Sequence, residues 1–308
     1  MKDFTTDEDA VHINRSLGLG LDEKILAPVM VTAETISNAM SGKKQNMDTL
    51  IKDAFQKIAS GKDLVLVGGA GALLTTGSAL GLSGAKVAQM LDTKVLLVTK
   101  YSPHLIDEVL TVAEKLGKLL IGLIINAVPT ERIAYVKDMI VPYLSEKKID
   151  VLSVIPYDTI LGSVSVEELA QNLGAEILCA EDKVQELIQH FIVGAMTVES
   201  AMNYFRRISD KAVITGGDRS DIQLAAMDTS TICIILTGNL SPTPAVLNKA
   251  KEKGIPLLSV KEDTLTTVEK VDQIIGKIPV RGMKKVAQAR MLFDEYVDFK
   301  RISNLLGF

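Results

Sequence analysis

The sequence contains neither Gly-Lys-Ser nor Gly-Lys-Thr. Phosphate-binding loops usually end in one of these tripeptides, whose lysine neutralises the phosphates while backbone N–H groups cradle them. Tryptophan is also absent, and aromatic residues make up 4% of the 308 residues, so stacking platforms for single-stranded nucleic acid are not expected. The net charge of −4 agrees with that exclusion, because nucleic-acid-binding domains carry a basic surface. We therefore expect neither ordinary ATP chemistry nor a nucleic-acid partner.

Long apolar runs, a signal peptide and metal-ligand spacings are missing too. No uninterrupted apolar stretch reaches the roughly 18 residues of a membrane span, and the acidic N-terminus lacks the apolar segment of a secretory signal. The two cysteines, Cys179 and Cys233, stand in apolar surroundings, which argues against a disulfide framework. The three histidines are scattered. The sequence thus predicts a cytoplasmic protein with no membrane contact and no metal site, and it identifies no cofactor.

Apolar residues are abundant, at 47%, and they alternate between strand and helix patterns. In the first half of the chain, four short apolar strands are separated by single helical segments, which is typical of βαβ crossovers and a parallel sheet. Binding loops in such a sheet follow the carboxyl ends of the strands. The predicted strands are 64–67, 94–99, 119–126 and 150–155, and the predicted helices are 49–60, 87–91, 105–116 and 133–145.

A second, smaller α/β cycle begins after residue 181, and an amphipathic helix is predicted over 284–306. The pattern leaves open whether that helix packs on either domain or on a partner. We therefore expect an α/β domain over 1–185, a smaller α/β domain over 186–282 and a helical tail over 283–308. In the second cycle the predicted strands are 212–215, 231–237 and 256–260, and the predicted helices are 196–207, 221–227, 242–253 and 264–276.

The strongest local signal is the turn that follows the strand ending at Thr215. Gly216 and Gly217 permit a close backbone approach, and Ser220 or Asp221 could cap the next helix, whose N-terminal N–H groups favour an anion. Arg219 could add a bidentate fork for phosphate or carboxylate. The competing interpretation is a tight structural turn in which Asp218 and Arg219 form an ion pair.

A second loop, Thr237-Gly238-Asn239, closes the next strand and would lie beside the first loop in a parallel sheet. Together the two loops are predicted to form a crevice for a small metabolite, a nucleotide or another subunit. Neither loop contains a histidine, a cysteine nucleophile or paired carboxylates in a catalytic arrangement. We therefore predict no catalytic residue here.

Several segments in order along the chain carry a family resemblance: 122–129 (GLIINAVP), 155–158 (IPYD), 165–170 (SVEELA) and 217–219 (GDR). Together they resemble the N-terminal half of long phosphate acetyltransferases, and stand-alone proteins that share it. That half joins a domain similar to dethiobiotin synthetase and cobyrinic acid a,c-diamide synthase to a DRTGG domain. The resemblance covers nearly the whole chain. In the DRTGG family the named positions correspond to Asp218, Arg219, Thr237 and Gly238, with Asn239 where a second glycine would be expected.

The resemblance implies a P-loop-NTPase-like, parallel-sheet domain that has lost its phosphate loop. The family's first strand, phosphate loop and first helix have no counterpart in this sequence, and Gly68 stands where the family carries a metal-binding glutamate. Gly68, Gly69, Asn126 and Pro156 would then be the remaining loops of a nucleotide site. The missing strand would lie beside 64–67, in the middle of the sheet, so backbone groups there would need another partner.

These features favour a non-catalytic regulatory protein that binds a metabolite or a partner through the DRTGG-like domain. The alternative is an ATP-dependent ligase of the dethiobiotin synthetase or diamide synthase type, either truncated or completed by a second chain. Acetyl transfer by this chain itself is the weakest interpretation. An open sheet edge and an amphipathic tail both predict a homo-oligomer or a partner subunit.

Overall fold

The computed structural model describes residues 7–43, 46–69, 71–275, 280 and 282–307. The chain divides into two compact units. Unit 1 comprises Met1–Pro156 together with Tyr296–Phe308, and unit 2 comprises Tyr157–Glu295. The predicted division at residue 185 lies inside unit 2, and the predicted tail over 283–308 is shared between both units. Residues 276–279 and 281, at the end of the predicted 186–282 domain, lie outside the described residues.

Unit 1 is built on a three-stranded parallel sheet with the order β1-β2-β3. Its strands are β1 (Val95–Lys100), β2 (Leu120–Val128) and β3 (Val151–Pro156), close to the predicted bounds. Successive residues of β2 serve opposite faces, as strand geometry requires. Leu123 and Ile125 pack in one core cluster, whereas Ile124 packs in another.

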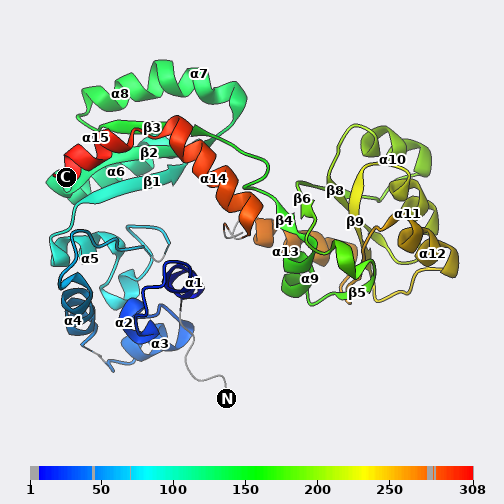
Figure 1. Cartoon of the computed structure of the whole chain (residues 1–308), viewed down its shortest axis with the longest axis horizontal. Helices are drawn as coiled ribbons and strands as arrows, with labels where there is room; N and C mark the ends of the chain where they lie inside the picture. Colours follow the sequence, from blue (N-terminus) through cyan, green and yellow to red (C-terminus); the bar gives the residue numbers. More distant parts are fainter. Residues whose placement is uncertain (1–6, 44–45, 70, 276–279, 281, 308) are drawn as a thin grey trace. The chain divides into compact units, whose positions relative to one another are not determined.

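Helices cover the two faces of this sheet (Figure 1). One face is covered by α6 (Leu105–Leu116) and by a continuous helical run of α7 (Ile133–Tyr135), a π-helical turn (Val136–Ile140) and α8 (Val141–Glu146). The π turn ends two residues before Pro142, which has no N–H to continue a regular hydrogen-bond ladder. The other face packs against α15 (Phe299–Leu306).

Among the described residues, five α-helices and one 3-10 turn (Ser78–Leu80) precede β1. The prediction anticipated α4 (Met47–Ala59) and α5 (Gly84–Leu91) but not the three before them. These three have signals in the sequence, because Asp7, Asp22 and Thr32 each accept a capping hydrogen bond at a helix start. They are α1 (Glu8–Ser16), α2 (Glu23–Leu26) and α3 (Ala33–Met40).

The strand predicted over 64–67 is wrong, because the segment is irregular and pairs with no strand of the described sheet. Its apolar side chains face outward: Leu64 is 49% exposed, Leu66 86% and Val67 51%. An apolar run has strand propensity, but a strand also needs a neighbour for its N–H and C=O groups. The sheet ends at β1 instead, which leaves β1 with one unpaired edge.

Unit 2 contains a five-stranded sheet with the order β5-β10-β9-β8-β7, in which only β5 runs antiparallel. The three strands predicted from the sequence are confirmed as β8 (Lys211–Gly216), β9 (Thr231–Thr237) and β10 (Leu257–Ser259). The edge strands β5 (Glu176–Cys179) and β7 (His190–Val193) were not predicted. Neither was a small two-stranded sheet of β4 (Val164–Ser165) and β6 (Leu187–Ile188).

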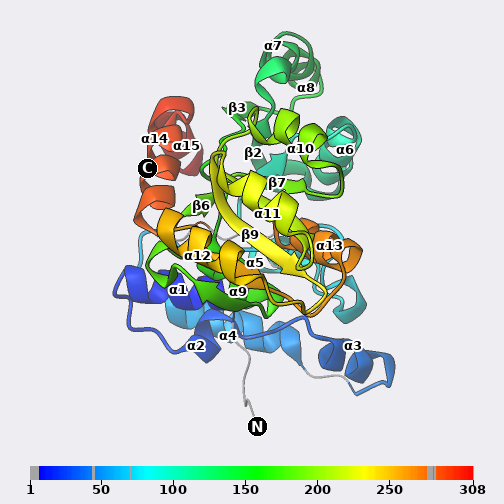
Figure 2. The same cartoon turned by 90° about the vertical axis from the view of Figure 1, so that its right-hand side faces the viewer.

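Helices lie on both faces of the unit 2 sheet (Figures 1 and 2). On one face are α10 (Val198–Phe205), α11 (Ser220–Met227) and α12 (Pro244–Lys253). On the other face are α9 (Val166–Leu173) and α13 (Thr264–Ile275). Cys233 of β9 is fully buried in the core cluster on the α9 and α13 face. The α/β class predicted for both halves is confirmed.

The single helix predicted over 284–306 is two helices, α14 (Met283–Tyr296) and α15. The break falls at Val297 and Asp298. Val297 is buried beside α15, and the Asp298 carboxylate accepts a hydrogen bond from the Arg301 N–H at 3.0 Å, which starts the new helix. Apolar periodicity alone does not reveal this internal N-cap. In the described part of the chain, no helix has the length and apolar character needed to cross a membrane.

Candidate functional site

The predicted binding loops lie at the carboxyl ends of β8 and β9, two neighbouring strands of the unit 2 sheet. Thr215 and Gly216 end β8, and they pair with Leu236 and Thr237 of β9. The N-terminus of α11 follows the first loop directly. The structure therefore brings together the loop residues that the sequence analysis selected: Thr215, Gly216, Gly217, Asp218, Arg219, Asp221, Thr237, Gly238 and Asn239.

The two loops make their closest contact at Gly217. It is buried, and its N–H donates to the Thr237 carbonyl at 3.1 Å. A Cβ at this position would lie 2.4 Å from the Leu240 backbone oxygen and 2.6 Å from the Leu240 Cβ. The first loop can thus approach the second only because residue 217 has no side chain.

Replacing Gly217 by alanine should displace the second loop, because the nearest obstructing atom is the backbone oxygen of Leu240, which no side-chain rotation can move away. We expect the free energy of unfolding to fall by about 1–3 kcal/mol, as for other overpacked sites. The matched control is Gly238→Ala, where the nearest atom lies 3.8 Å from the new Cβ and the strain comes from a φ of +84°. Both variants lose stability, but only Gly217→Ala should reduce the hydrogen-exchange protection of the residue 217 amide, because its hydrogen bond to the Thr237 carbonyl is displaced. Unchanged protection of that amide in Gly217→Ala would show that the close approach is not needed.

The structural interpretation of this turn predicted an ion pair between Arg219 and Asp218. That prediction is wrong, because the partner of Arg219 is Asp221. The Nε and Nη2 atoms of Arg219 both lie 3.0 Å from the carboxylate of Asp221, and Nη2 also donates to the Met196 carbonyl at 2.9 Å. This pair lowers the pKa of Asp221 and raises the pKa of Arg219. Because the two side chains are 35% and 51% exposed, the pair contributes little to stability. The Arg219 guanidinium, which the sequence suggested as a bidentate donor to an anion, thus donates to the exposed carboxylate of Asp221.

The N-terminus of α11 has no side-chain cap. The prediction that Ser220 or Asp221 caps it is wrong, because the N-cap position is Arg219 and the Ser220 hydroxyl instead lies 3.5 Å from the Thr243 hydroxyl. A helix start without a cap leaves backbone N–H groups that favour a negative charge.

Gln223 is a buried polar residue of this region that sequence reasoning missed. Its Nε2 donates to the Gly216 carbonyl at 2.8 Å, which ties the first loop to α11. Its Oε1 has no hydrogen-bond partner among the described residues, although the side chain is fully buried. One weak signal could have identified it, since a glutamine among the apolar residues of α11 departs from the apolar pattern.

The second loop is shaped by its own backbone. Gly238 and Asn239 both have positive φ, +84° and +56°, a conformation that suits glycine and that asparagine tolerates. Their N–H groups donate to the carbonyls of Glu262 and Val260 at 2.7 and 2.9 Å. The Thr237 hydroxyl lies 2.8 Å from that of Thr264. Asn239 thus fills a glycine-like position in conformation.

The residues predicted as remnants of a nucleotide site are only partly brought together. Asn126 and Pro156 lie on adjacent strands at the carboxyl edge of the unit 1 sheet. The Asn126 Oδ1 already accepts a hydrogen bond from the Ala127 N–H at 2.8 Å. Gly68 and Gly69 lie in the irregular segment before β1, and Ala70 lies outside the described residues.

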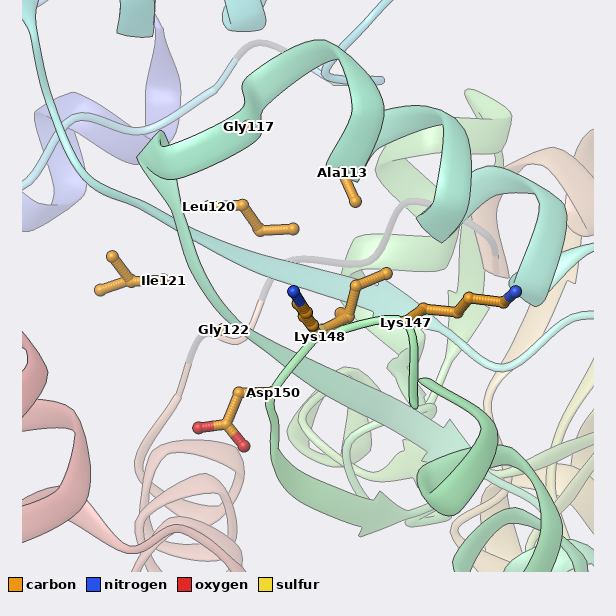
Figure 3. Close-up of a pocket in the computed structure, with 9 residues that line it drawn as sticks. Ala113, Gly117, Leu120, Ile121, Gly122, Lys147, Lys148 and Asp150 are labelled. Carbon is orange, nitrogen blue, oxygen red and sulfur yellow. The ribbon is translucent and has the colours of Figure 1, made fainter. Parts of the chain in front are cut away.

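Unit 1 also contains a cavity of about 230 Å³ at the amino ends of β2 and β3 (Figure 3). Lys147 and Lys148 line it, but Figure 3 shows their ammonium groups pointing in different directions. The Nζ of Lys147 lies 5.5 Å from the centre of the Tyr143 ring, and Asp150 pairs with Arg301. The cavity therefore lacks a set of charges directed at one point. Across the described residues, no three His, Cys, Asp or Glu side chains gather as a metal site.

Two family models match the chain. The AAA domain model matches residues 2–165, and the DRTGG domain model matches residues 168–274. The second match contains both loops at the carboxyl edge of the unit 2 sheet.

Curated relatives include phosphate acetyltransferases. The Synechocystis protein is 24% identical over 289 residues, covering 89% of this chain and 41% of its own length. The Nitratidesulfovibrio vulgaris protein is 29% identical over 163 residues, covering 50% of this chain and 23% of its own length. A cobalt-dependent inorganic pyrophosphatase of Clostridium perfringens is 28% identical over 123 residues, covering 40% of this chain and 20% of its own length. This chain thus spans less than half the length of each of these relatives.

A solved structure also matches: the CBS and DRTGG domains of the regulatory region of Clostridium perfringens pyrophosphatase, complexed with the activator diadenosine tetraphosphate. It is 16% identical, covers 54% of this chain and 84% of its own, and has a TM-score of 0.33, a likeness too slight to support a functional argument. The family models and the order of the two domains are the stronger findings. The chain belongs to the AAA domain family and joins that domain to a DRTGG domain, as in the N-terminal region of phosphate acetyltransferases.

Proposed function

We propose that this chain is a non-catalytic regulatory protein whose DRTGG domain binds an anionic small metabolite, with nucleotides and acyl-CoA compounds as the first candidates. The observation that carries the proposal is the position of Arg219. Its guanidinium lies at the uncapped N-terminus of α11, where helix N–H groups and a bidentate fork would serve the same anion.

The present partner of the fork is exchangeable. Asp221 is 51% exposed, so a phosphate could take its place at Arg219 without a buried charge being left unpaired. Gln223 holds the first loop in place through the Gly216 carbonyl, and Gly217 lets that loop pack directly against the second loop.

A thermal-shift panel of nucleotides and acyl-CoA compounds tests this proposal. We expect at least one compound to stabilise the wild type, and Arg219→Ala to lose that stabilisation. Arg207→Ala is the matched control, because Arg207 is an exposed arginine of the same unit beyond the end of α10. Asp221→Asn should bind more tightly than the wild type, since it releases the fork. If no compound in the panel binds the wild type, and Arg219→Ala leaves assembly unchanged, the proposal fails.

The ATP-dependent ligase that the sequence left as an alternative gains no support from unit 1. Gly68 and Gly69 lie outside the sheet, and the side-chain oxygen of Asn126 is occupied by a backbone N–H.

We also propose that unit 1 assembles with a second copy of the chain through its open edge. In the described structure β1 has an unpaired edge, and the segment 64–67 is apolar, exposed and without a partner strand. Each copy would supply one such segment and one open edge, so the pairing can be reciprocal and closed.

Light scattering tests this assembly. We expect the wild type to be a dimer or larger, and Leu66→Lys to shift it towards the monomer, because a lysine blocks edge pairing. Tyr204→Lys, an equally drastic change at a side chain 53% exposed in unit 2, should leave the assembly intact. A monomeric wild type would rule the assembly out.

A further inference from the structure

A cavity of about 500 Å³ lies in unit 2 at the edge of the sheet opposite the DRTGG loops. Asp210, which precedes β8, and Ile232, near the start of β9, line it, so it is at the amino ends of these strands. One wall is a single face of α14, whose lining residues recur at helical spacing. They are Lys284, Ala287, Gln288 and Met291. The volume is within the range of small-molecule sites.

The α14 wall is anchored to the rest of unit 2. Lys285 is buried, and its Nζ donates to the Ser163 carbonyl at 2.7 Å. Gln288 donates through Nε2 to the Asp158 carboxylate, also at 2.7 Å. The cavity is therefore bounded by a helix that two hydrogen bonds hold against the rest of unit 2.

The lining combines a large apolar part with charges of both signs. Glu186 and Asp210 contribute carboxylates, and Lys284 contributes an ammonium group. Among the described residues, none of these three forms a salt bridge, although Gln189 donates to Asp210 at 3.4 Å. The apolar part is made by Ile160, Leu187, Ile232, Ala287 and Met291.

Asp210 is held in an unusual backbone conformation. Its φ is +50°, in the left-handed region, and its N–H donates to the Ser230 hydroxyl at 3.3 Å. Its carbonyl accepts hydrogen bonds from the N–H groups of Gln189 and His190. These contacts position the carboxylate at the rim of the cavity independently of any ion pair.

We propose that this cavity binds a small zwitterion with an apolar body, of the class of apolar amino acids. Lys284 would bind its carboxylate, and Asp210 and Glu186 would bind its ammonium group. The apolar lining would take the side chain, which burial stabilises by roughly 25 cal/mol per Å² of apolar surface. The lining thus offers separate partners for the two opposite charges and for the apolar body of such a ligand.

Isothermal titration of the full-length protein with leucine, methionine, phenylalanine and valine tests the proposal. At least one should bind. For the best binder, the amide, which lacks the carboxylate, and the deamino acid, which lacks the ammonium group, should each bind about tenfold or more weakly. Arg219→Ala should bind as the wild type does, which separates this site from the one in the DRTGG loops.

Two variants assign the charges. Lys284→Met should abolish the preference for the free acid over the amide, and Asp210→Asn should abolish the preference for the free acid over the deamino acid. Asparagine suits residue 210 because it tolerates a positive φ. Asp272→Asn, at an exposed carboxylate of α13, is the control and should change nothing. Failure of all four amino acids to bind, or binding that neither cavity variant alters, would overturn the proposal.

Discussion

Replacing Phe205 by alanine should lower the free energy of unfolding of unit 2 by about 3–5 kcal/mol, the usual range for a buried phenylalanine. Phe205 is fully buried on α10 and packs in the core that joins α10, α11 and α12 to β8 and β9. The same core carries the two strands whose loops form the candidate site. A cavity at this position therefore weakens the support of both loops.

Hydrogen exchange of the β8 and β9 amides measures this effect in unit 2 alone, because the opening free energy is read residue by residue. The control is Tyr204→Ala, the neighbouring position, where the side chain is 53% exposed. That variant should change the opening free energy by less than about 0.5 kcal/mol. Equal effects of the two variants would contradict the assignment of Phe205 to the core.

Raising the pH should stabilise unit 2 through Lys211. This lysine is fully buried at the start of β8, and its Nζ donates to the Ile208 carbonyl, the Thr229 hydroxyl and the Ser230 carbonyl at 2.8–3.1 Å. Burial lowers its pKa from 10.5 to about 8, against an opposing effect of Asp210. Between those two values the unfolded chain binds one more proton than the folded chain, so the free energy of unfolding rises with pH.

The rise attributable to Lys211 is about 3 kcal/mol over the whole interval from pH 8 to pH 10.5. The measurement is the exchange-derived opening free energy of β8 at several pH values, compared with Lys211→Met. Burial also lowers the pKa of Lys285, but that contribution is common to both proteins and cancels in the difference. Parallel pH dependences in the two proteins would show that Lys211 titrates as it does in the unfolded chain.

The sequence predicted elements well where local pattern and tertiary partners agree. The predicted bounds of β9 match the observed ones. A continuous apolar run between two turns is typical of a buried strand in a parallel sheet. The segment 64–67 has an equally apolar pattern, yet it is irregular because pairing depends on a neighbour that pattern does not report. The break before α15 was missed because the apolar pattern continues across it. The Asp298 carboxylate caps a new helix there, and apolar periodicity does not report such a cap.

The candidate site was predictable in its location but not in its contacts. Each loop follows the carboxyl end of a predicted strand, and the two strands are parallel neighbours. This was enough to place both loops at one edge of the sheet. The partner of Arg219 depends on side-chain rotamers, and the choice of Asp221 over Asp218 was not available from spacing. Gln223 and the α14 cavity involve residues distant in the sequence or buried out of pattern, so only the fold reveals them.

We propose that Arg219 and the start of α11 bind the anionic group of a metabolite. The decisive experiment is calorimetric titration of the wild type, Arg219→Ala and Arg207→Ala with the best compound of the panel and its phosphate-free counterpart. We expect the wild type and Arg207→Ala to prefer the phosphorylated compound by about tenfold or more, and Arg219→Ala to lose that preference. The same preference in Arg219→Ala as in the wild type would contradict the claim.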